Sequence, residues 1–92
     1  MDTITLTKPI TVKGKEIDKI TLDFNSVTGQ DMINAETEAR AAGDQSPSVL
    51  LSMKYQAALA AKIIGISYDD VIGLPGGDFK KIVLPVANFL LS

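Results

Sequence analysis

The sequence contains no cysteine, no histidine and no tryptophan. Without cysteine there is no disulfide, no thiolate nucleophile and no Cys₄ zinc site, and without histidine the usual general base near neutral pH is missing too. A chain of 92 residues builds one small domain, whose core leaves no room for a large substrate cavity. We therefore expect no enzyme, no bound metal and no cofactor.

The sequence also lacks a strong excess of charge and a long apolar run. Nine Lys and Arg stand against eleven Asp and Glu, and the basic residues occur singly or in pairs, which argues against a nucleic-acid partner. The longest apolar stretch, residues 82–91, contains Pro85 and Asn88, whereas a membrane span needs about 20 apolar residues. No secretory signal opens the chain, so we expect a soluble, intracellular protein that binds no membrane.

The first 25 residues are predicted to form a β-hairpin. Threonines dominate the odd-numbered positions of its first half, and the even-numbered positions that share one strand face are Ile4, Leu6, Ile10 and Val12. Gly14 supplies a turn that requires positive φ, and a second strand follows over residues 16–24.

Two features disturb this hairpin pattern. Pro9 cannot donate to a strand ladder, which favours an edge strand. In the second strand Ile17 is odd-numbered while Ile20 is even-numbered, so a bulge is expected near residues 18 and 19.

Helix signals begin after residue 25. Thr28 followed by Asp31 predicts a capping box that opens a helix over residues 28–42. Ser46 followed by Pro47 predicts the start of a second helix, which ends at Gly65.

Two further helices are expected toward the end of the chain. Ser67 with Asp70 opens a short one that stops near residue 74, and Asp78 caps a last helix that runs to about residue 91. Pro85 lies inside that helix, so a kink or a division into two pieces is expected. The order of elements indicates an α+β fold, one domain over residues 1–92 with a β-hairpin (1–25) and a helical part of three to four helices (26–92).

The second and the last predicted helices are apolar around most of their circumference. Such a helix is either enclosed by the rest of the chain or keeps one stripe for a partner, and the sequence leaves both alternatives open. If a stripe remains exposed, the leading candidates for partner contact are Leu51, Tyr55, Leu59, Ile63, Phe79 and Phe89.

Two patterns imitate functional motifs. Ala61, Gly65 and Val71 have the spacing of a helix-turn-helix, but the segment that would enter DNA, residues 67–72, carries two aspartates and no basic residue. Those aspartates suit the first turn of a helix, where the helix dipole favours negative charge, and no companion ligands for a metal stand nearby. Neither DNA binding nor a metal site is expected.

Short motifs follow one another along nearly the whole chain: Ile4-Thr5-Leu6, Lys8-Pro9-Ile10, Gly14-Lys15, Leu22-Asp23-Phe24, Thr28-Gly29-Gln30-Asp31-Met32-Ile33 with Ala35-Glu36, Leu74-Pro75, Asp78-Phe79 and Asn88-Phe89-Leu90. In this order they resemble the small tail assembly chaperones of tailed bacteriophages, of the Mu-like type. The motifs consist of hydrophobic spacing and turn residues, and none of them contains a catalytic group.

The resemblance implies a non-structural helper in the cytoplasm of the bacterial host that is absent from the mature virion. Its partner would be the phage tape measure protein, which it keeps soluble during assembly, and a longer frameshifted form would engage the tail tube protein. The alternative is a small self-assembling structural or adaptor protein that stays in the particle, with a second copy of the chain as its partner in a homo-oligomer.

Overall fold

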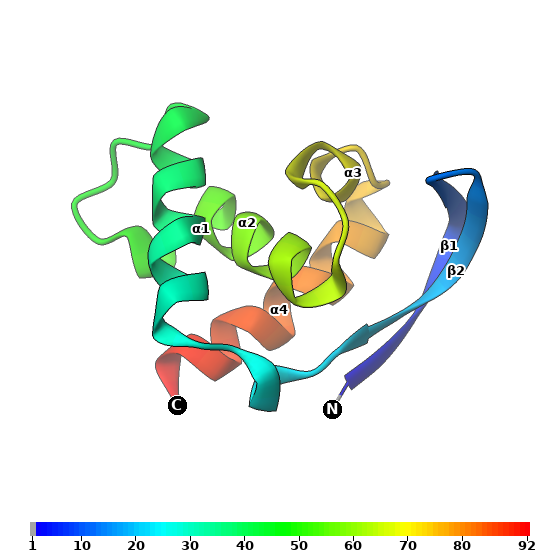
Figure 1. Cartoon of the computed structure of the whole chain (residues 1–92), viewed down its shortest axis with the longest axis horizontal. Coiled ribbons are helices and arrows are strands. Elements are labelled where there is room, and N and C mark those ends of the chain that lie inside the picture. Colours follow the sequence, from blue (N-terminus) through cyan, green and yellow to red (C-terminus); the bar gives the residue numbers. More distant parts are fainter. Residues whose placement is uncertain (1) are drawn as a thin grey trace.

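A computed structural model describes residues 2–92 of the chain. An antiparallel hairpin precedes four α-helices and two 3₁₀ turns (Figure 1), which confirms the predicted α+β class. The elements are β1 (Asp2–Val12), β2 (Lys15–Leu22), η1 (Phe24–Ser26), α1 (Gly29–Ala41), η2 (Val49–Leu51), α2 (Met53–Ile64), α3 (Tyr68–Ile72) and α4 (Gly76–Leu91).

The hairpin turns at Lys13 and Gly14, which both have positive φ, of 52° and 78°. Two successive residues with positive φ form the tight turn whose twist matches that of the flanking strands, so the predicted glycine turn is confirmed. Lys13 is the one non-glycine residue in this conformation among the residues described.

The ladder is irregular at Asp18, where the bulge was predicted, but the extra residues lie in the first strand. Thr5 pairs with Lys19 and Ile10 pairs with Ile17, which leaves residues 6–9 opposite the single residue Asp18. Pro9 falls in this looped-out segment because it has no N–H to give to the ladder.

The second strand ends at Leu22, two residues earlier than predicted. The carboxylate of Asp23 accepts a hydrogen bond from the amide of Asn25 at 3.1 Å, which turns the chain into η1. Phe24 thereby leaves the sheet, and its ring stacks on that of Phe89 in α4, with centroids 4.9 Å apart.

The capping boxes predicted at Thr28 and at Ser67 are both present, so the starts of α1 and α3 are confirmed. The predicted start of the second helix was wrong, since α2 begins at Met53. Ser52 caps it by accepting hydrogen bonds from two amides of the first turn. The amide of Ser46 instead donates to the carboxylate of Asp44 at 2.9 Å, which holds Ser46 in the loop.

The predicted cap of the last helix was also wrong. α4 begins at Gly76, directly after Pro75, and Asp78 lies two residues inside it. The helix continues without interruption past Pro85, so the expected division into two pieces does not occur.

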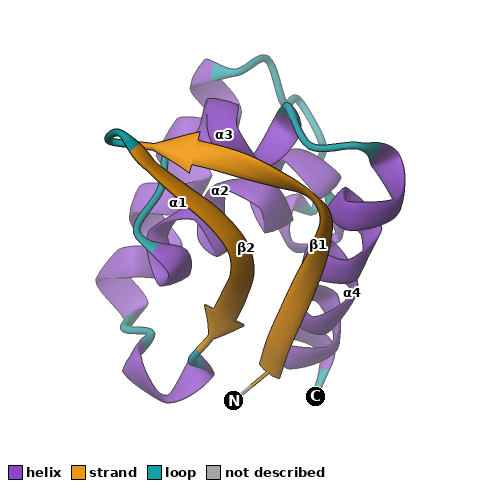
Figure 2. Ribbon diagram, turned by 90° about the vertical axis from the view of Figure 1, so that its right-hand side faces the viewer, coloured by secondary structure: helices purple, strands orange, loops and turns teal. Residues whose placement is uncertain are grey.

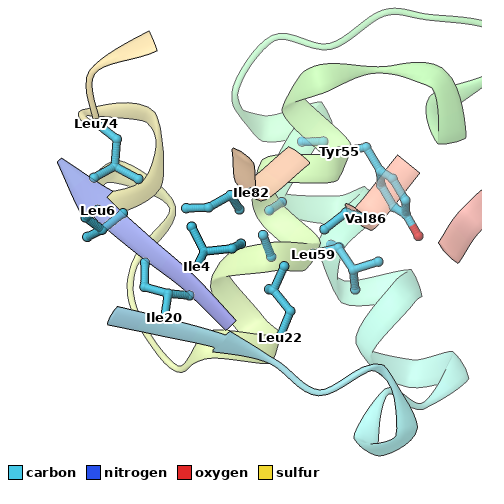
Figure 3. Packing of buried hydrophobic residues seen from close by; sticks show 13 residues of the cluster. Ile4, Leu6, Ile20, Leu22, Tyr55, Leu59, Leu74, Ile82 and Val86 are labelled. Atoms are coloured by element: carbon cyan, nitrogen blue, oxygen red, sulfur yellow. The ribbon is translucent and has the colours of Figure 1, made fainter. Parts of the chain in front are cut away.

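The core is built around α2, with the hairpin, α1 and α4 packed on different sides of it (Figure 3). β1 lies on the side of α4 and β2 on the side of α1 (Figure 2). The hairpin contributes Ile4, Leu6, Ile20 and Leu22, and the helical part contributes Ala35, Ala39, Tyr55, Ala58, Leu59, Ala60, Leu74, Ile82 and Val86.

Candidate functional site

The central helix α2 is enclosed by its own chain. Every residue over 55–61 is buried, and Tyr55 and Leu59 expose 2% and 0% of their surface. Ile63, one turn further on, is half-buried against the core. Of the two alternatives for this helix, enclosure therefore holds. The run of alanines in α2 is the sequence signal for it, because small side chains let neighbouring elements approach closely.

α4 is different because one of its faces stays open. Ile82, Val83 and Val86 lie on the inner face, whereas Leu84 and Leu91 are 58% and 65% exposed on the outer face. These two leucines, which we call the α4 stripe, are seven residues apart and so lie on the same side of the helix. Sequence reasoning singled out Phe79 and Phe89 on this helix instead, and the structure places both half-buried against the core.

A second apolar surface lies at the entry to α2. Leu50, Leu51 and Met53 are exposed there, and Leu51 exposes 63% of its surface. We call these three residues the η2 patch. η2 contacts α4, so the patch and α4 adjoin in the fold. Of the six residues that the sequence proposed for partner contact, Leu51 is the one that is exposed.

A shallow, open groove lies between α4 and residues 2–5 of β1. It measures about 650 Å³ and is lined by Asp2, Thr3, Ile4, Thr5, Lys81, Leu84 and Pro85. Figure 2 shows β1 and α4 running beside one another along this side of the molecule. Leu84 thus belongs both to the α4 stripe and to the groove.

Asp78 joins α4 to β1 just beyond the Thr5 end of this groove. Its buried carboxylate accepts hydrogen bonds from the amide and the hydroxyl of Thr7 and from the amide of Lys8, and the ammonium of Lys81 lies 3.6 Å away. The hydrogen bond from the Thr7 amide is the main reason that the pKa of Asp78 lies below its usual value, although burial acts in the opposite direction. The side chain therefore remains a carboxylate and ties α4 to β1.

Sequence reasoning predicted Asp78 as the cap of the last helix, so it did not identify the contact of Asp78 with β1. Pro75 was the signal that the helix begins earlier. Proline favours the first turn of a helix, so a helix that starts beside Pro75 places Asp78 inside that turn rather than before it.

The two motif-like patterns have structural roles. Gly65 ends α2 with a φ of 87°, and Ala61 and Val71 pack against each other across the turn to α3. Asp70 accepts a hydrogen bond from the amide of Ser67 as part of the capping box, and Asp69 is exposed in the same turn. Within residues 2–92 no group of three or more acidic side chains could hold a metal ion. No helix in that range has the length and apolarity to cross a bilayer.

Comparison with known proteins gives one informative result. A sequence family described as "Phage tail assembly chaperone proteins, E, or 41 or 14" matches residues 3–91. Comparison with curated proteins and with solved structures gives no match.

Proposed function

The chain belongs to the phage tail assembly chaperone family, and we propose that it binds the tape measure protein through the α4 stripe and the η2 patch and keeps that protein soluble until the tail is assembled. The observation that supports this most directly is the exposure of Leu51, Leu84 and Leu91, which expose 63%, 58% and 65% of their surface. A long helical client with apolar seams would cover these side chains, and α4 offers it a helix face to pack against.

The energetics of such a contact suit a temporary partner. Covering one large apolar side chain completely contributes about 1.5–3 kcal/mol, so three leucines supply at most roughly 5–9 kcal/mol. Association itself costs on the order of 4–15 kcal/mol in lost freedom of motion. Binding through these leucines alone is therefore weak and reversible, as a helper that must release its client requires.

The proposed surface differs from the set of residues that the sequence suggested. Leu51 belongs to both sets, and the half-buried Ile63, Phe79 and Phe89 lie at the margin of the core. Tyr55 and Leu59 would reach a client only if the helices separated, so an aspartate at position 59 would test folding rather than binding.

Tail assembly takes place inside the infected cell, so we place the chaperone in the cytoplasm of the bacterial host and expect it to leave the tail before the virion is complete. No catalytic step is part of the proposal. Shielding of apolar seams needs only a complementary surface and reversible contact.

The test is co-expression with the tape measure protein of the same phage. The double variant Leu84→Ser, Leu91→Ser should leave most of the client in the pellet after centrifugation, whereas wild type keeps it in the supernatant. Ile33→Ser is the matched control, because Ile33 is a similarly exposed apolar residue (59%) on α1. Circular dichroism confirms that all variants are folded.

A folded double variant that solubilises the client as well as wild type does would refute the proposed surface. Mass spectrometry of purified virions addresses the alternative function. Stoichiometric copies of the chain in the particle would favour a structural or adaptor protein, and the light-scattering mass of the free protein would then show a homo-oligomer.

A further inference from the structure

The edge of β1 that faces the groove carries unpaired backbone groups. The amide of Thr7 donates to Asp78 and the ammonium of Lys81 lies 3.5 Å from the carbonyl oxygen of Thr5, so both backbone groups point toward α4 and away from β2. Residues two apart in a strand point the same way. The N–H and C=O groups of Thr3 therefore also face the groove, as does the N–H of Thr5, outside the β1–β2 ladder.

None of the hydrogen bonds formed by residues 2–92 outside that ladder engages the amide of Thr3 or of Thr5. Beyond Thr5 the edge cannot pair with another strand, because the amides of Thr7 and Lys8 already donate to Asp78. The open edge is therefore limited to residues 2–5. At about 3.3 Å per residue it is roughly 13 Å long, which is enough for about four residues of an added strand.

The groove supplies a floor for such a strand. Ile4 turns its side chain into the core, and a residue of an added strand on that same face would lie over Leu84 and Pro85 of α4. An aliphatic side chain at this position would cover Leu84. The opposite face of the added strand would continue the exposed threonine face of β1 and remain in water.

The charges at the two ends of the groove differ in sign. Lys81 lies at the Thr5 end and keeps 48% of its side chain exposed despite its contact with Asp78, whereas Asp2 lies at the other end. A complementary segment carries an acidic residue beside Lys81 and a basic residue beside Asp2.

A second folded copy does not suit this edge. In each copy β1 packs against α4 and β2 packs against α2. A strand that arrived with its own helix would bring that helix against the α4 that already forms the floor. A single extended segment brings no such helix.

From these features we propose that the free edge of β1 at Thr3 and Thr5 binds an extended segment of the client by adding it as a strand, with an aliphatic side chain over Leu84 and an acidic residue at Lys81. The inference rests on the proposed function, since it assigns to the same client a second mode of contact beside the α4 stripe.

Thr5→Pro tests the backbone contact. Proline suits an extended strand and removes the outward N–H of Thr5 without touching the β1–β2 ladder. Thr5→Val is the matched control, because valine keeps the N–H and the branched shape. We expect Thr5→Pro to weaken binding of the purified full-length chain to the tape measure protein by roughly tenfold or more, and Thr5→Val to bind like wild type.

Amide hydrogen exchange of the wild-type protein gives a second readout that does not depend on the folding of the proline variant. The amides of Thr3 and Thr5 should exchange more slowly when the tape measure protein is bound.

If the client binds while these amides exchange at their free rate, or if Thr5→Pro binds as tightly as Thr5→Val, strand addition is wrong and the proposed function stands. Failure of wild type to bind the client would overturn both. Protection that rises with protein concentration in the absence of client would show a second copy at this edge and overturn the inference.

Discussion

The carboxylate of Asp78 accepts hydrogen bonds from the backbone amide of Thr7 at 3.0 Å and from its hydroxyl at 2.9 Å, across 71 residues of sequence. Thr7 lies where the β1–β2 ladder is interrupted, so its amide has no strand partner. The carboxylate of Asp78 is fully buried, and a buried carboxylate is costly without hydrogen-bond donors, which the amide and hydroxyl of Thr7 supply. The same contact holds β1 beside α4 and thereby shapes the groove between them.

Asp78→Asn should loosen the hairpin from the helices. The amide NH₂ of asparagine would face the N–H groups of Thr7 and Lys8, and two donors repel one another. We expect a melting temperature several degrees below that of wild type and faster amide exchange in the hairpin than in α2. Asp69→Asn, an exposed aspartate on α3, is the control and should melt like wild type. Equal melting temperatures for both variants would show that the contact contributes nothing to stability.

Stability should depend on pH in the acid range through Asp44. The hydroxyls of Ser46 and Ser52 and the amide of Ser46 lower the pKa of Asp44 from 3.8 to about 2 in the folded chain. A carboxyl whose pKa is lower when folded stabilises the protein above its unfolded pKa, and this contribution disappears as the pH falls through its folded pKa. The contribution of Asp44 is thus complete above about pH 4 and is lost toward pH 2.

The measurement is a series of thermal melts between pH 2 and pH 6. Asp44→Asn should melt below wild type at pH 6, and the gap should narrow as the pH falls from 4 to 2. A gap of constant size across this range would mean that the charge of Asp44 has no part in stability.

Gly65→Ala should destabilise the protein for a purely conformational reason. Gly65 has a φ of 87°, and a Cβ added there meets nothing within 4 Å, so no clash contributes. An L-residue in this left-handed conformation costs about 1–2 kcal/mol. Gly77→Ala in the first turn of α4 also meets open space but has no positive φ, and it should be neutral or stabilising by up to about 1 kcal/mol. Urea unfolding of the two variants compares them directly, and equal losses would argue against backbone strain.

Leu59→Ala should separate folding from binding. Leu59 is fully buried, so its truncation leaves a cavity and is expected to cost about 2–5 kcal/mol in the free energy of unfolding. Leu84→Ala removes a mostly exposed side chain and should change stability by less than about 0.5 kcal/mol. Denaturant melts measure both. When its affinity is corrected for the unfolded fraction, Leu59→Ala should bind the tape measure protein like wild type. A lower corrected affinity would mean that Leu59 contacts the tape measure protein.

Local signals predicted two of the four helix starts in this chain. A capping box depends on two side chains three residues apart, so Thr28 with Asp31 and Ser67 with Asp70 could be identified from spacing alone. The Ser46–Pro47 signal failed because the carboxylate of Asp44 accepts a hydrogen bond from the Ser46 amide and holds Ser46 in a turn. Hydrophobic periodicity does not reveal such a turn.

The amino-acid sequence by itself determined the α+β order, the Gly14 turn, two helix starts and, through motifs spread along the chain, the family. Each of these depends on residues close together in the chain or on their order. Only the tertiary structure decided which apolar helix face is covered. α2 and α4 are similar in apolarity, yet α2 lies between the hairpin and the other helices while α4 lies at the margin. Burial is a property of position among all elements, and no periodicity within one helix specifies it.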